Sequence, residues 1–110
     1  MADLRNYKEE LKEAVKRERE ADKNWSWSLK AVTKTSAKIG WGYLDYIGEN
    51  ELFTLEITED EDLNIVCGTL PNGQKIYAFI GETRWDDAKT FEEGVKIMVH
   101  AMARSAHFTY

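Results

Sequence analysis

The sequence predicts an α+β fold, in which an antiparallel five-stranded β-meander is flanked by an N-terminal and a C-terminal helix. Apolar residues recur every three or four positions near both ends of the chain and alternate with polar residues in between. Short turns separate the strand-like segments, so we expect sequence neighbours to pair in space. The predicted layout is a single domain over residues 1–110, with a helix at 1–24, the sheet at 25–81 and a helix at 90–107.

Length and composition are typical of a self-folding domain. The chain has 110 residues, of which 43% are hydrophobic, so it can bury a core unaided. One cysteine and two histidines predict no internal disulfide, no cofactor and no metal. No apolar run is long enough to cross a bilayer, and the first residues are charged. We therefore expect a soluble protein of the reducing cytoplasm without a membrane partner.

The first helix is predicted over residues 3–23, with Asp3 as its N-cap. Its apolar stripe consists of Leu4, Tyr7, Leu11, Ala14 and Val15. After Val15 the sequence is polar on all sides, so little packing is expected there. We expect these last turns to project from the molecule or to fray.

Residues 25–81 alternate with the period of a strand that buries one face. In the first strand, the side chains expected to point inward are Trp25, Trp27, Leu29 and Ala31. Gly40 and Gly42 interrupt the second strand, over residues 37–47, and predict a bulge or strong curvature there. The third strand, at 52–58, should bury Phe53, Leu55 and Ile57.

The segments 63–70 and 75–81 flank a turn formed by Pro71, Asn72 and Gly73. Proline at the first central position and glycine at the fourth predict a type I turn followed by a left-handed residue. These two segments should therefore form a bulged hairpin.

The last helix should begin at Thr90, whose hydroxyl and the Glu93 carboxylate form the pattern of a capping box. Its core line is Phe91, Val95, Met98 and Met102. We expect this helix to cover one face of the sheet.

The net charge of −5 is unevenly distributed along the chain. Residues 50–110 hold eleven acidic and five basic side chains, and four of the acids are consecutive: Glu59, Asp60, Glu61 and Asp62. One interpretation is a solvated loop between two strands. The spacing does not fit a calcium loop, which needs acids at alternate positions and a glycine at the bend. The other interpretation is an acidic patch that docks on a basic surface. Asp86 and Asp87, which flank an exposed Trp85, would join this patch: the carboxylates would pair with Lys or Arg of the partner, and Trp85 would supply apolar anchoring.

No catalytic motif is present, so we do not expect an enzyme. Cys67 is predicted to be a buried structural thiol, because nothing in the spacing places a histidine beside it. An alternative function is single-stranded nucleic-acid binding by stacking on Trp25, Trp27, Trp41 and Trp85. The alternation, however, places Lys30, Lys34 and Lys38 on the face opposite Trp25 and Trp27. A homo-oligomeric structural subunit, including a homodimer, is a third alternative.

These observations predict a small acidic binding protein that inhibits or regulates a larger protein by covering a basic, nucleic-acid-binding surface, such as that of a nuclease. Size and charge resemble two settings by analogy only. One is a phage protein that antagonises host defence, such as an anti-CRISPR protein, and the other is an immunity protein against a nuclease toxin.

Overall fold

A computed structural model describes residues 3–21, 25–43, 51–59 and 63–109. The elements, in chain order, are η1 (Leu4–Tyr7), α1 (Lys8–Ala21), β1 (Trp25–Val32), β2 (Ser36–Tyr43), β3 (Glu51–Glu59), β4 (Asn64–Thr69), β5 (Lys75–Phe79) and α2 (Phe91–Thr109). The five strands form one antiparallel sheet whose spatial order is the chain order. The predicted α+β meander with a helix at each end is confirmed.

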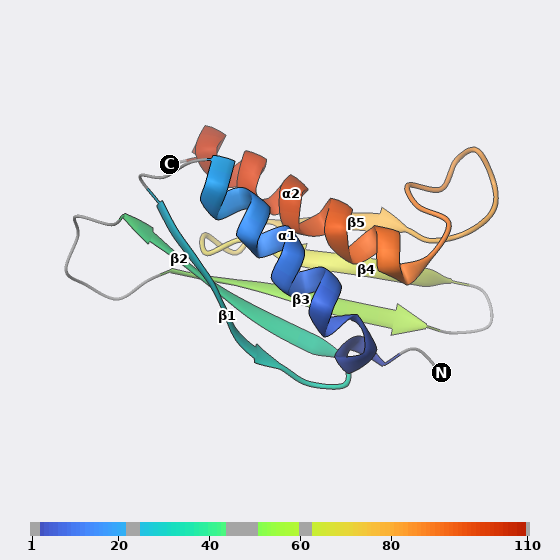
Figure 1. Ribbon diagram of the computed structural model, residues 1–110. Coiled ribbons are helices and arrows are strands. Elements are labelled where there is room, and N and C mark those ends of the chain that lie inside the picture. Colours follow the sequence, from blue (N-terminus) through green and yellow to red (C-terminus); the bar gives the residue numbers. More distant parts are fainter. Residues whose placement is uncertain (1–2, 22–24, 44–50, 60–62, 110) are drawn as a thin grey trace.

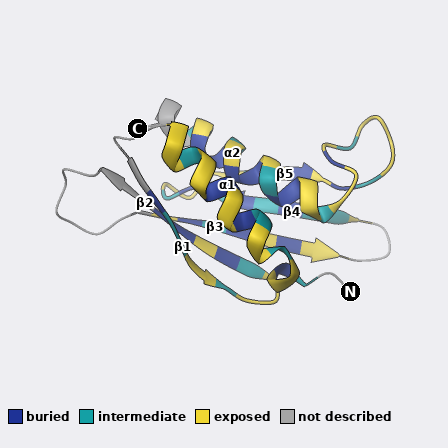
Figure 2. Ribbon diagram, viewed as in Figure 1, coloured by how far each residue is buried: buried dark blue, intermediate teal, exposed yellow. Residues whose placement is uncertain are grey.

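Both helices lie side by side on the same face of the sheet (Figure 1). The helix α1 packs on β1, whereas α2 packs on β4, β5 and β3, and the two helices contact each other. The alternation of apolar and polar residues predicted that one face of the sheet is covered. We had expected only the C-terminal helix on that face, whereas both helices lie there. The opposite face of the sheet carries no element among the described residues, and exposed residues alternate with buried ones along its strands (Figure 2).

The core lies between the sheet and the helix pair. Its largest fully buried side chains include Phe53, Ile39 and Leu55 from the sheet, Leu11 from α1, and Met98 and Met102 from α2. Trp27 is 3% exposed, and its ring lies 5.5 Å from the ring of Phe53. The core line predicted for α2 is confirmed at Val95, Met98 and Met102, and Phe91 packs against its margin. Burial of these side chains supplies most of the stability of such a fold.

Two glycines allow α2 to approach the sheet closely. A Cβ atom on Gly68 of β4 would lie 2.6 Å from the sulfur of Met98 and 2.7 Å from that of Met102. A Cβ atom on Gly94 of α2 would lie 2.5 Å from the terminal methyl of Ile80. The space that a side chain would need at either position is therefore already filled by the core.

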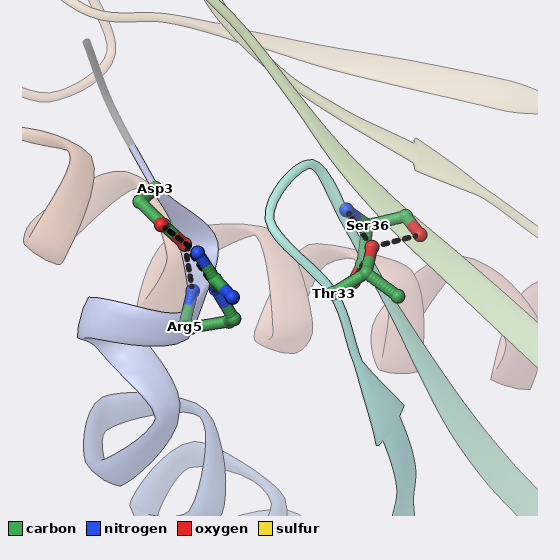
Figure 3. Close-up of polar contacts among 4 residues, drawn as sticks. All are labelled: Asp3, Arg5, Thr33 and Ser36. Atoms are coloured by element: carbon green, nitrogen blue, oxygen red, sulfur yellow. Dashed lines mark hydrogen bonds and ion pairs between the residues drawn. The ribbon is translucent and has the colours of Figure 1, made fainter.

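The first helix begins as predicted but differs in its first and last turns. Asp3 is the N-cap, and its carboxylate accepts hydrogen bonds from the backbone and guanidinium of Arg5 (Figure 3). The first turn, η1, is a 3-10 turn rather than α-helix. The helix continues to Ala21, and the expectation that its polar half projects is wrong. Glu18 is only 14% exposed and contacts His100 of α2 at 2.8 Å.

The strand β1 contains an irregularity that the alternation did not reveal. The register with β2 shifts between Leu29 and Ala31, so Lys30 and Ala31 together face Lys38. Ala31, which was predicted to point inward, is therefore exposed. The bulge predicted for the glycines of β2 lies instead on the neighbouring strand, where the stem of Lys30 covers Gly40.

The turn between β1 and β2, the predicted β4–β5 hairpin and the predicted cap of α2 are each seen with their hydrogen bonds. The turn from Thr33 to Ser36 joins β1 to β2 (Figure 3). In the β4–β5 hairpin, Gly73 has φ 91° and its N–H donates to Leu70 O at 2.9 Å. At the start of α2, Glu93 N–H donates to Thr90 Oγ1 at 3.2 Å, while the Glu93 carboxylate accepts from Lys89 N–H rather than from Thr90.

Candidate binding surface at one end of the sheet

The meander brings two acidic segments to the same end of the sheet. Glu59, the last residue of β3, is in register with Asn64, the first residue of β4. The N–H of Ile80, which follows β5, donates to Asn64 O at 3.0 Å. The end of β3 and the loop over residues 81–88 therefore lie at one end of the sheet (Figure 1). Asp60, Glu61 and Asp62 lie outside the described residues, so their part in a patch stays a prediction.

Asp87 anchors the loop 81–88 to the edge of the sheet. Its carboxylate accepts a hydrogen bond from Phe79 N–H at 2.8 Å, and its own N–H donates to Phe79 O at 2.9 Å. Gly81 N–H donates to Ala88 O at 2.9 Å, and Ala88 is buried. The loop is therefore closed at its base and held by an apolar contact.

Asp86 closes the tip of the same loop. Its Oδ2 atom accepts hydrogen bonds from Thr83 N–H at 3.0 Å and from Thr83 Oγ1 at 2.7 Å. The Thr83 hydroxyl in turn accepts from Trp85 N–H at 3.3 Å. These short-range bonds fix the backbone on both sides of Trp85.

Trp85 is presented to solvent by this pinned loop. It is 79% exposed, the highest value among the large exposed hydrophobic side chains of the described residues. The guanidinium carbon of Arg84 lies 4.7 Å from the centre of its ring, within the range of a cation–π contact. The sequence prediction identified Trp85 but not Arg84, although the adjacency of the two residues was a visible signal.

The acidic residues at this end of the sheet differ in exposure. Glu59, Glu82 and Asp87 are exposed, whereas Asp86 is half-buried. The two cations of the loop region are Arg84 and Lys89, and within the described ranges neither forms an ion pair with a carboxylate. The predicted residues Glu59, Trp85, Asp86 and Asp87 thus share one end of the sheet, but Asp86 and Asp87 also hold the loop together.

Cys67 does not have the surroundings of a nucleophile. It is half-buried on the face of the sheet away from the helices, where its neighbours on the adjacent strands are Glu56 and Tyr77. Burial raises the pKa of the thiol, with a further rise from Glu56, against the lowering effects of Lys75 and Thr69. His100 lies on α2, on the other side of the sheet, and contacts Glu18. Cys67 was expected to be buried and is instead partly accessible.

No cluster of three or more metal-ligating side chains occurs in the described part of the chain. Among the same residues, no helix is long and apolar enough to span a membrane. A scan against protein-family models, a search of curated proteins and a search of solved structures each found no match.

Proposed function

We propose that this protein is a non-enzymatic inhibitor or regulator that docks the Trp85 end of its sheet on a basic surface of a larger protein, in the cytoplasm. The observation that carries the proposal is the 79% exposure of Trp85 on a loop pinned by Asp86 and Asp87. An exposed tryptophan loses little conformational freedom on binding when its backbone is already fixed. Tryptophan is also among the residues that contribute most to binding at protein interfaces.

The charge around Trp85 supports a basic partner. Glu59 and Glu82 lie at the same end of the sheet, and the consecutive acids 60–62 follow Glu59 in the sequence. Such a grouping would steer a cationic surface toward the loop and lose effect in salt. Surfaces of this kind are typical of nucleic-acid-processing enzymes, so a nuclease is the partner class that we favour. An anti-CRISPR or a toxin-immunity role remains an analogy drawn from size and charge.

The test is a capture experiment with matched variants. The wild-type chain, Trp85→Ala and the control Leu52→Ala would be immobilised and exposed to an extract of the native host, and captured proteins read by mass spectrometry. Both changes remove an exposed apolar side chain, since Leu52 is 44% exposed on the sheet face. We expect a basic, nucleic-acid-binding protein that the wild type and Leu52→Ala retain and Trp85→Ala loses. Equal capture by all three chains would remove Trp85 from the binding surface.

A second measurement asks whether capture means inhibition. The purified partner would be titrated with the chain while it binds a labelled oligonucleotide. We expect the chain to displace the oligonucleotide, and displacement to weaken as salt is raised. A partner that binds chain and oligonucleotide together would contradict the inhibitor proposal while leaving a binding role.

Single-stranded nucleic-acid binding is supported less well. Trp27, one of its four proposed stacking platforms, is 3% exposed and packs on Phe53. Titration with an oligonucleotide at low salt separates the two functions, because stacking on Trp85 would quench its fluorescence.

A further inference from the structure

A basic groove runs along β1 beside α1, away from the Trp85 loop. It consists of two adjoining hollows of about 320 and about 270 Å³. Lys12 and Leu29 line both hollows. The remaining lining residues are Val15, Lys16, Arg19 and Ser28 in the first, and Lys8, Lys30, Ala31 and Val32 in the second. We refer to these two hollows together as the β1 groove.

The charge of the β1 groove is opposite to that of the whole chain. Five of its lining side chains are cationic, and in the part of the chain that the structure describes none is acidic. Lys12 and Lys16 contact Glu9 at 3.5 Å and Glu20 at 4.0 Å, through side chains that are half-exposed or more. Exposed pairs of this kind are weak, so both lysines remain available to a more favourable anionic partner.

The floor of the groove is the outer edge of β1, which no other described strand covers. Within the described ranges, β2 is the one strand that pairs with β1. The carbonyl of Trp27 points away from β2, since it accepts a hydrogen bond from Arg19 Nη1 at 3.5 Å. Backbone groups alternate along a strand, so the N–H and C=O of Leu29 point to the same open edge. Groups of this kind bind an added strand.

The spacing of the cations matches that of an added strand. Lys8, Lys12 and Lys16 follow one another at four-residue intervals, or about 6 Å along the helix axis. Alternate residues of a strand are about 6.6 Å apart and point to the same side. Every second side chain of a strand laid along β1 would therefore meet one lysine of α1.

We propose that the β1 groove binds an extended segment of a partner protein with acidic residues at alternate positions, which pairs with β1 as a sixth strand. Carboxylates on one side of this segment contact Lys8, Lys12 and Lys16, while the apolar lining takes the rest of its surface. A second copy of this chain is a poor occupant, because pairing of two β1 edges would bring two rows of lysine together. Nucleic acid would use the charge but not the open backbone of Leu29. The proposal is independent of the Trp85 surface.

The test uses a labelled eight-residue peptide of alternating glutamate and threonine, with binding to the full chain followed by fluorescence anisotropy. We expect the double variant Lys12→Glu, Lys16→Glu to bind the peptide about tenfold more weakly than the wild type. The control Lys75→Glu, Lys89→Glu has the same net charge and changes exposed lysines outside the groove. It should bind within about twofold of the wild type. Equal loss in both variants would overturn the proposal, because binding would then depend on net charge alone.

Peptide methylation tests the strand pairing separately. In one peptide the backbone nitrogens of the glutamates are methylated, and in another those of the threonines. Only one of these two sets can face β1, so we expect one peptide to lose binding and the other to keep it. Equal binding of both peptides would overturn strand addition. Tighter binding of an oligonucleotide with four phosphates, abolished in the Lys12, Lys16 variant, would assign the groove to nucleic acid and also overturn the proposal.

Discussion

At the scale of single residues, the acidic side chains after β5 serve the fold as well as the surface. The sequence predicted that Asp86 and Asp87 flank an exposed Trp85, and the exposure is confirmed. It could not show that the Asp87 carboxylate accepts from Phe79 N–H, because this bond depends on how residues 80–88 fold back on the strand. A charge run in a sequence carries no information about which oxygens already have donors.

Asp87 should therefore contribute to the stability of the fold, whereas Glu82 of the same loop should not. The change Asp87→Ala leaves Phe79 N–H without its acceptor, so we expect the free energy of unfolding to fall by about 1 kcal/mol. Glu82→Ala removes one negative charge from the same loop and should change it by less than about 0.5 kcal/mol. Urea denaturation of both variants measures the difference. Equal effects would mean that the Asp87 bond is not specific.

Asp3 should make stability depend on pH in acid. The side-chain hydrogen bond from Arg5 lowers the pKa of Asp3 from 3.8 to about 2, helped by the Arg5 backbone N–H and charge and opposed by burial. Because the folded pKa is the lower one, the contribution is complete above about pH 4 and is lost as the pH falls through about 2. We expect Asp3→Asn to lack this component of the acid dependence. Urea unfolding of both chains across this range checks it, and identical slopes would contradict the assignment.

At the scale of elements, the sequence predicted what local patterns determine. The Pro71 to Gly73 hairpin and the core line of α2 depend on residues a few positions apart, and both are confirmed. The bulge at Ala31 and the docking of the polar half of α1 were not predicted. The bulge depends on the register with β2, and the docking on Glu18 meeting His100, 82 residues away. Contacts between residues so far apart produce no periodic pattern in the sequence, so they could not be predicted from it.

The contact between α2 and β4 should be sensitive to one methyl group. The change Gly68→Ala places a Cβ atom where Met98 and Met102 already lie, so we expect a loss of about 1–3 kcal/mol in the free energy of unfolding. Ordinarily alanine would be no worse than glycine within a strand. A second substitution, Met98→Ala, makes room, so the two changes together should cost less than the sum of the separate losses. Additive losses in thermal unfolding would show that the Met98 sulfur does not constrain Gly68.

At the scale of the whole molecule, both helices lie on one face of the sheet, and none of the described elements covers the other face. Its exposed large side chains include Leu52, Tyr77 and Phe79, which are 42–55% exposed. Lys38, Glu56 and Lys75 interrupt them on the same face. The alternation could not reveal this arrangement, since the same inward set results whichever helix covers it.

The interrupted apolar surface predicts a monomer. Charged side chains among the exposed apolar ones disfavour stacking of two such faces, because each charge would lose water without a guaranteed partner. Sedimentation equilibrium at two protein concentrations should give the monomer mass at both, and Tyr77→Lys should sediment identically. A mass that rises with concentration, and no longer does so in Tyr77→Lys, would favour the homo-oligomeric subunit.

The contact between α1 and α2 couples the unfolding of the two edges of the sheet. In a meander, each strand pairs with its neighbours in the sequence, so either edge strand could unfold first without the rest of the sheet. Here α1, which precedes β1, and α2, which follows β5, contact each other on one face of the sheet, and Glu18 and His100 form part of this contact. Neither edge strand can then detach without also parting the helices. Exchange of the amide hydrogens of β1 and β5 should therefore report one shared opening event rather than two independent ones.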